Sequence, residues 1–259
     1  MPAYFALDLW LSLGTSLGAG TLALLLWRRG LAPAYKGFVA YLVAECLCGV
    51  ALTVAGFRLK SNMQALFFLV LQPVLWIFYI VMVREIHAKS LARFRGIARV
   101  GQQVLLYGMI GSIVLSVATV QPDLHSINHA GAVPILYVTA AHRVVTGGLT
   151  LFLLLLTAIL TWFPVPTSRN TILHTTLAFV FFLLMTVAHL YRNLTGKEVT
   201  DQVNHCIMAM GALCLVAWAV LLQPAGEAAR KEDSPSTAES GWIFAQLEAL
   251  NRALLRVVK

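Results

Sequence analysis

The chain has 259 residues, of which 59% are hydrophobic and only 12% are charged, and its mean hydropathy is +0.79. Soluble domains carry about 25% charged residues, so this composition excludes an ordinary soluble protein and is typical of one embedded in a membrane. The net charge of +8 is explained below by membrane topology, and we expect no nucleic-acid partner.

Seven segments are long and apolar enough to cross a bilayer, which takes about 20 apolar residues each. In chain order they are residues 4–27, 37–57, 64–83, 101–120, 134–163, 172–191 and 205–222. Backbone polar groups must be paired within each segment in lipid, so each segment is expected to be a helix. The predicted fold class is all-α: a polytopic membrane protein in contact with the lipid bilayer, with a seven-transmembrane-helix bundle over residues 1–223.

Lysine and arginine are distributed unevenly between the two sides of these spans. Loops on one side hold nine of them and loops on the other side hold four. The first set is Arg28, Arg29, Lys36, Arg84, Lys89, Arg93, Arg95, Arg99 and Arg169, and the second is Arg58, Lys60, Arg192 and Lys197. By the positive-inside rule, this pattern predicts a multi-pass protein of a bacterial inner membrane with its N-terminus outside and its C-terminus in the cytoplasm. Basic and apolar residues alternate between 84 and 99, which predicts a short helix on the inner leaflet.

The second span contains a carboxylate. Glu45 lies eight residues after Gly37, about 12 Å into the span and close to the bilayer centre. An ionised carboxylate is costly there, so Glu45 is expected to be protonated or paired within the bundle. We take it as a candidate ligand-binding residue. The alternative is a neutral carboxyl group bonded to Gln72, beside the helix-kinking Pro73, or to a backbone carbonyl.

Histidine and arginine gather toward the outer ends of the later spans. The fifth span has 30 residues, and counting 20 back from its inner end places His142 and Arg143 at the outer boundary. His189, Arg192 and His205 fall on the same side. Three interpretations remain open: helix ends anchored to water and headgroups, an anion or headgroup site using Arg143, Arg192 and His205, or a cofactor site in which His142 and His189 bind haem or a metal.

Two classes of seven-span protein fit poorly. Rhodopsins attach retinal to a lysine of the last helix, and the span 205–222 has no lysine. The heptahelical zinc hydrolases that resemble ceramidases use paired HxxxH motifs, whereas this sequence has a single HxxxH, His125 to His129, and it lies between the predicted spans 101–120 and 134–163. An enzyme is therefore not favoured.

The sequence changes character after Gln223. Residues 224–241 are polar and rich in serine and proline, which predicts a flexible linker. Residues 242–259 are predicted to form an amphipathic cytoplasmic helix, because its apolar residues recur at steps of three and four: Ile243, Leu247, Leu250, Leu254 and Val257. Such a short helix needs another surface, which is the membrane, the bundle itself, a second copy or a protein partner.

Three stretches carry a resemblance: SLARFRGIARVG at 90–101, FPVPTSRN at 163–170 and QLEALNRALLR at 246–256. They resemble a group of bacterial seven-span integral membrane proteins to which no activity is assigned. The resemblance implies the seven-span fold and no site or cofactor. Together these features predict a non-enzymatic, sensor-like or accessory component of a membrane complex. The alternative is a haem- or metal-binding membrane redox protein that uses the outer histidines.

Overall fold

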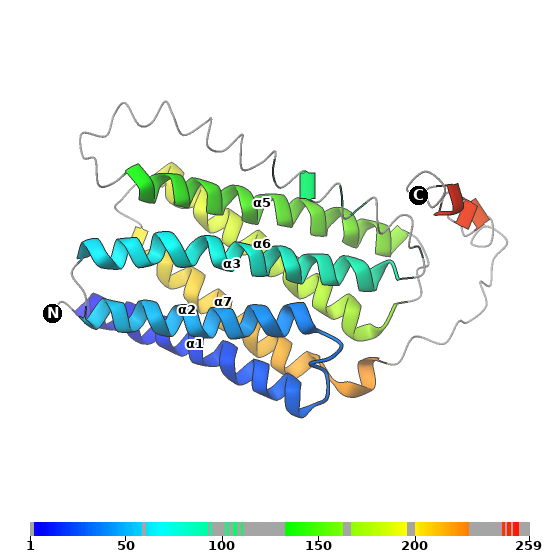
Figure 1. Cartoon of the computed structure of the whole chain (residues 1–259), viewed down its shortest axis with the longest axis horizontal. Helices are drawn as coiled ribbons and strands as arrows, with labels where there is room; N and C mark the ends of the chain where they lie inside the picture. The colour runs from blue at the N-terminus through cyan, green and yellow to red at the C-terminus, as the bar shows by residue number, and fades with distance from the viewer. Residues whose placement is uncertain are drawn as a thin grey trace.

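The computed structural model describes residues 3–58, 61–92, 94, 133–162, 167–195 and 200–227, together with isolated positions in 101–110 and 245–253. Six long helices are α1 (Ala3–Arg28), α2 (Lys36–Arg58), α3 (Ser61–Ser90), α5 (Val133–Trp162), α6 (Arg169–Thr195) and α7 (Thr200–Leu221), and the short 3-10 helix η2 (Pro224–Glu227) follows them (Figure 1). Each long helix contains a stretch apolar enough to cross a membrane, which confirms a multi-pass helical architecture. The predicted span 101–120 and the predicted helix 242–259 fall largely outside the described residues.

The six helices form a closed ring in the order α1, α2, α3, α5, α6, α7, and α3 also contacts α6 across the ring. Sequence neighbours among the described helices run antiparallel, except α3 and α5 (Figure 1). These two run parallel, because Gln72 contacts His142 and, further along both helices, His87 contacts Phe152. The ends of α1, α3, α5 and α7 and the starts of α2 and α6 therefore share one end of the bundle, here called the η2 end. We call the opposite half the distal half.

Aromatic rings fill the middle of the ring of helices. Phe38 and Trp218 lie with their ring centroids 4.8 Å apart, Tyr41 and Tyr79 5.2 Å apart, and Tyr79 and Phe182 5.2 Å apart. All five side chains are buried. We call these five residues, with Phe181, the aromatic layer. Because offset and edge-to-face contacts pack such rings without gaps, the layer separates the interior of the distal half from the η2 end.

The end of α3 and the end of the folded body both lie further along the chain than the sequence predicted. Helix α3 continues to Ser90, and Ile86, Leu91 and Phe94 are buried, so these apolar side chains pack into the protein and not onto the inner leaflet as expected. At the other boundary, η2 extends the folded body to Glu227, past the point where the linker was predicted to begin. The reason in both cases is that polar side chains near these boundaries bond to other helices, as described below.

Small residues bring α1 and α2 together. Gly20 faces Cys46, and Gly49 faces Ser16 so closely that a Cβ on Gly49 would lie 2.8 Å from the Ser16 Cβ. In lipid, apolar burial does not drive helices together, so this close backbone approach supplies the packing that holds the pair.

We expect Gly49→Ala to lower the free energy of unfolding in detergent by about 1–3 kcal/mol, because the added methyl group must push α1 away. The matched control is Gly211→Ala on α7, where a Cβ meets nothing within 4 Å. There the gain in helix propensity should leave stability unchanged or higher by up to about 1 kcal/mol. Equal effects of the two substitutions in a thermal unfolding assay would contradict this account of the α1–α2 contact.

Candidate functional site

A first polar group lies inside the distal half, on facing sides of α3 and α5. His142 is buried, and its Nδ1 accepts a hydrogen bond from the indole N–H of Trp76 at 2.9 Å. The Nε2 of Gln72 lies 2.8 Å from the same Nδ1. An indole nitrogen can only donate, so Nδ1 carries no proton. His142 is therefore a neutral ring with its proton on Nε2.

The second histidine lies against the first. The rings of His142 and His189 meet edge to face, with centroids 4.7 Å apart and an interplanar angle of 82°. The structure thus brings together the two residues that the sequence placed at similar depth. Binding of one metal or haem by both rings would require the rings to separate and the Trp76 bond to break, because the proton on Nε2 blocks that nitrogen. Among the residues that the structure describes, no group of three or more histidine, cysteine or acidic side chains is arranged to hold a metal ion.

Glu45 lies on α2 beside the aromatic layer. The hydroxyl groups of Tyr41 and Tyr79 are hydrogen-bonded to each other, and the Glu45 carboxyl group interacts electrostatically with both. Its Oε2 atom is shielded from solvent and has no hydrogen-bond partner among the described residues. Gln72, the partner considered for Glu45 from the sequence, bonds to His142 instead.

The remaining predicted site residues lie toward the distal end of the bundle. Arg143 is half-buried in the first turn of the apolar part of α5. His205 is half-buried near the start of α7. Arg192 belongs to α6, but its side chain lies outside the described residues. The anion site proposed for these three residues therefore stays a prediction.

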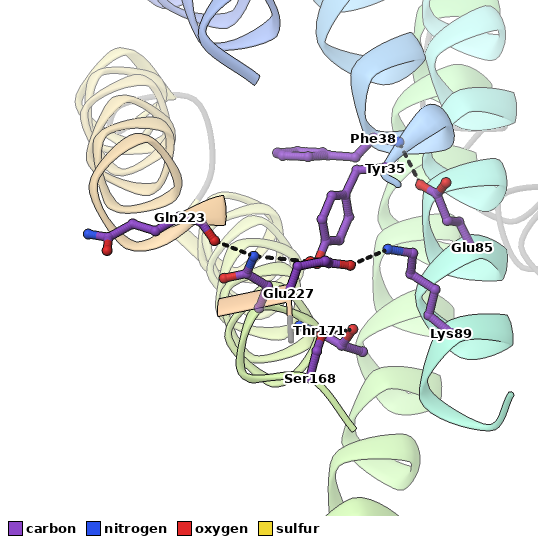
Figure 2. A network of polar contacts seen from close by, with 9 residues as sticks. Tyr35, Phe38, Glu85, Lys89, Ser168, Thr171, Gln223 and Glu227 are labelled. Carbon is purple, nitrogen blue, oxygen red and sulfur yellow. Dashed lines mark hydrogen bonds and ion pairs between the residues drawn. The ribbon is translucent and has the colours of Figure 1, made fainter. Parts of the chain in front are cut away.

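A second polar group, which the sequence did not reveal, lies at the η2 end. Glu227 accepts hydrogen bonds from the Tyr35 hydroxyl at 2.9 Å and from the Asn170 Nδ2 at 3.0 Å, and it forms an ion pair with the Lys89 Nζ at 3.2 Å. Figure 2 shows the carboxylate reached from separate parts of the bundle. We call these four residues the Glu227 clasp. It joins the α1–α2 connection, α3 and α6 to η2.

Local structure explains how the donors of the clasp are positioned. The Ser168 Oγ accepts the N–H of Thr171, which caps the start of α6 and fixes Asn170 between them. The Asn170 Nδ2 also donates to the Gln223 carbonyl at 2.7 Å. The Lys89 Nζ lies 3.6 Å from the centroid of the Tyr35 ring, a cation–π contact that orients the ammonium group toward the carboxylate.

Further contacts hold the surrounding backbone. The Glu85 Oε2 accepts the N–H of Phe38 at 3.1 Å, satisfying a donor in the first turn of α2 (Figure 2). One guanidinium nitrogen of Arg29 donates to the carbonyls of Ala219 at 2.6 Å and Leu222 at 2.7 Å. A cation at the C-terminal end of α7 complements its helix dipole and its unpaired carbonyl groups. The segment that leads into η2 is therefore fixed to α1 as well.

These contacts determine the ionisation states of Glu227 and Tyr35. Burial by itself would raise the pKa of Glu227, but hydrogen bonds from Asn170 and Tyr35 and the charge of Lys89 outweigh it and lower that pKa. Burial, followed by the bond to Glu227 and its negative charge, raises the pKa of Tyr35 above its usual range. At neutral pH the clasp is thus a carboxylate that accepts from a phenol, an amide and an ammonium group.

The clasp was missed because its members are far apart in the sequence and match no motif. The available signal was indirect: Lys89 directly precedes the stretch SLARFRGIARVG, and Asn170 ends the stretch FPVPTSRN. Comparisons with protein-family models, with curated proteins and with solved structures gave no match. The two polar groups are therefore the features of this protein that bear on its function.

We expect stability to depend on pH through Glu227. A lowered pKa means that the carboxylate stabilises the fold above its unfolded pKa of about 4.3, and that this contribution is lost as the pH falls through the folded value. The side chain is 34% exposed, so screening limits the effect to about 1 kcal/mol. Thermal unfolding should find Glu227→Gln less stable than wild type at neutral pH and equal to it in strong acid.

The tautomer of His142 is directly measurable. Nitrogen NMR of histidine-labelled protein should show an unprotonated Nδ1 and a protonated Nε2 for the resonance that disappears in His142→Gln. Trp76→Phe removes one donor and should shift the Nδ1 resonance without protonating it at neutral pH, because Gln72 still contacts that nitrogen. A resonance with a protonated Nδ1 would contradict the hydrogen-bond assignment.

Proposed function

We propose that this protein is a non-enzymatic, sensor-like component of a bacterial inner membrane, in which the distal interior receives the input and the Glu227 clasp controls the C-terminal tail. The clasp carries this proposal. One carboxylate, on the segment that directly follows the last helix, collects donors from three other parts of the bundle. A shift of any of these parts changes how firmly the start of the tail is held.

The direction of the helices supports the proposed topology. Helices α3 and α5 are parallel, so the chain between them must return from the η2 end to the distal end. A crossing by residues 101–120 meets this need and makes seven spans. The ends that carry Arg28, Lys36, Lys89 and Arg169 all lie at the η2 end. The positive-inside rule then places the η2 end and the C-terminus in the cytoplasm, and the N-terminus and the distal half toward the outside.

Two helices belong to both polar groups, which supports coupling between them. Helix α3 carries Gln72 and Trp76 at the His142 contact and Lys89 at the clasp. Helix α6 carries His189 at one end and Asn170 at the other. Packed helices move as rigid elements with discrete arrangements, so a change around His142 displaces donors of Glu227.

Release of the clasp acts on the tail. We propose that residues 242–259 form the amphipathic helix and that, when residues 224–227 detach, it reaches a protein partner or a second copy. A haem- or metal-binding redox protein is the alternative from another class. It draws on the contact between His142 and His189, and an absorption spectrum with a Soret band that is lost in His189→Ala would favour it.

The test is trypsin cleavage of the tail in oriented membrane vesicles. Arg230 and Lys231 follow Glu227 closely in the sequence. Cleavage there should require access from the cytoplasmic face and should be about five-fold faster in Glu227→Gln, the factor that corresponds to about 1 kcal/mol of local opening. In the coupling arm, His142→Phe, which cannot accept the Trp76 bond, should change the cleavage rate at least two-fold.

Matched controls accompany each arm. Arg28→Gln alters an exposed charged residue at the same end but outside the clasp and should cleave like wild type. Leu190→Ala lies one residue from His189 on an exposed face of α6 and should also cleave like wild type. Cleavage from the outer face would refute the topology. A His142→Phe rate equal to wild type would refute the sensor, even if the clasp itself is present.

A further inference from the structure

The polar interior of the distal half ends at Glu45. Below it, toward the η2 end, the aromatic layer closes the bundle, with Tyr41 and Tyr79 contributing both their rings to the layer and their hydroxyl groups to the Glu45 side. The rings of Tyr79 and His142 also approach, with centroids 6.4 Å apart. Glu45 therefore lies at the inner limit of the group that contains His142 and His189.

In the part of the chain that the structure describes, no cation is paired with Glu45 to offset the charge that it would have when ionised. Its carboxyl group forms no ion pair with any described lysine or arginine, and its Oε2 has no hydrogen-bond partner among them. The titratable groups around it are neutral in their ordinary state: Tyr41 and Cys48 on α2, Tyr79 on α3, Cys214 beside Tyr41 on α7, and, beyond Tyr79, His142 on α5 and His189 on α6. The apolar stretch of α1 has no titratable group before Arg28.

The surroundings of Glu45 do not suit a larger cation. Among the described residues, no group of three or more histidine, cysteine or acidic side chains could hold a metal ion. The rings of Tyr41 and Tyr79 pack against each other, and the ≈ 10 Å³ cavity lined by Phe181, Met185, Gly211 and Cys214 among others is not lined by Glu45. An organic cation or a metal ion with its ligands needs more room and more oxygen donors. A proton needs neither.

We infer that Glu45 is a proton-binding site, filled from the outer side through the distal interior, and that proton binding is the input of the function proposed above. The carboxylate takes a proton from water and becomes a carboxylic acid, and the same proton returns to water on release. The protonated carboxyl group of Glu45 has an O–H that can donate a hydrogen bond. The nearby hydroxyl groups of Tyr41 and Tyr79 can accept one as well as donate one. The ionised form carries a charge in a region of low dielectric, and it draws both hydroxyl protons toward itself at the expense of the bond between Tyr41 and Tyr79.

Under this proposal, ionisation of Glu45 affects the Glu227 clasp through helices α2 and α3. Tyr41 on α2 and Tyr79 on α3 pack directly against each other. Toward the η2 end, about one turn further along α2 and nearly two along α3, the two helices meet again where Glu85 binds the N–H of Phe38, and Lys89 lies one turn beyond Glu85. Loss of the hydroxyl pair loosens α2 from α3 and so changes the position of Lys89 relative to Glu227.

Infrared spectroscopy of the full chain in lipid vesicles tests the inference. Wild type at neutral pH should show the carbonyl stretch of a protonated carboxylic acid, absent in Glu45→Gln and fully retained in Glu85→Gln. Raising the outer pH should abolish the band, whereas raising the inner pH alone should not. Tyr79→Phe should shift the band without removing it, because one neighbouring hydroxyl is lost.

Several outcomes decide against the inference. A band that survives in Glu45→Gln, or wild type with no such band at neutral pH, overturns it. A band that sodium or another small cation abolishes at constant pH replaces the proton with that cation as the ligand. If Glu45→Gln fails to fold, the band and its pH response in wild type and Tyr79→Phe still decide the matter. These readouts leave the trypsin assay untouched, so failure of the proton site and failure of the sensor are separable.

Discussion

The absence of water from the hydrocarbon core is the constraint on which this structure depends. A polar side chain inside the ring of helices can take its hydrogen bonds only from the protein, because lipid offers none, and the Oε2 atom of Glu45 is an exception that has no such partner among the described residues. Thr146, Thr150 and Thr186 bond to backbone carbonyls one turn earlier, and Thr150 also meets Thr186 at 3.2 Å. His142 takes its partners from α3. Hydrogen bonds between these polar residues thus hold helices of the distal half together, where apolar packing alone would not do so in lipid.

Helix α3 provides both side chains that contact the Nδ1 atom of His142. Pro73 removes the backbone hydrogen bond to the carbonyl of Leu69, so the helix is weakest one turn before the contact with His142. Gln72 and Trp76 lie on either side of this point and are both fixed to the ring of His142. A relay between the two halves, as proposed here, would require α3 to have two arrangements, and the proline is the point at which the helix can most easily bend.

Sequence reasoning predicted what depends on composition and depth. Hydropathy located the six spans that the structure describes, and depth counting placed His142 and His189 at the same level, where they are in contact. It did not find the clasp, because Tyr35 and Glu227 are separated by almost the whole chain and each resembles an ordinary loop residue. Gln72 shows the same limit. From the sequence it was considered as a partner of Glu45, but in the structure it contacts His142. The choice depends on how each helix is rotated about its own axis, which the sequence does not give.

The strengths of the two polar sites differ in a way that suits their proposed roles. A charge on Glu45 has no counterion among the described residues, so in our proposal its protonation state is coupled to the packing of α2 on α3. The Glu227 clasp is partly exposed, and screening holds each of its charged contacts to about 1 kcal/mol or less. Coupling between two sites is reciprocal in free energy, so under the proposed function a change at either site shifts the equilibrium of the other by the same coupling energy. The population that moves more is that of the site whose two states are closer to balance, which in this proposal is the partly exposed clasp.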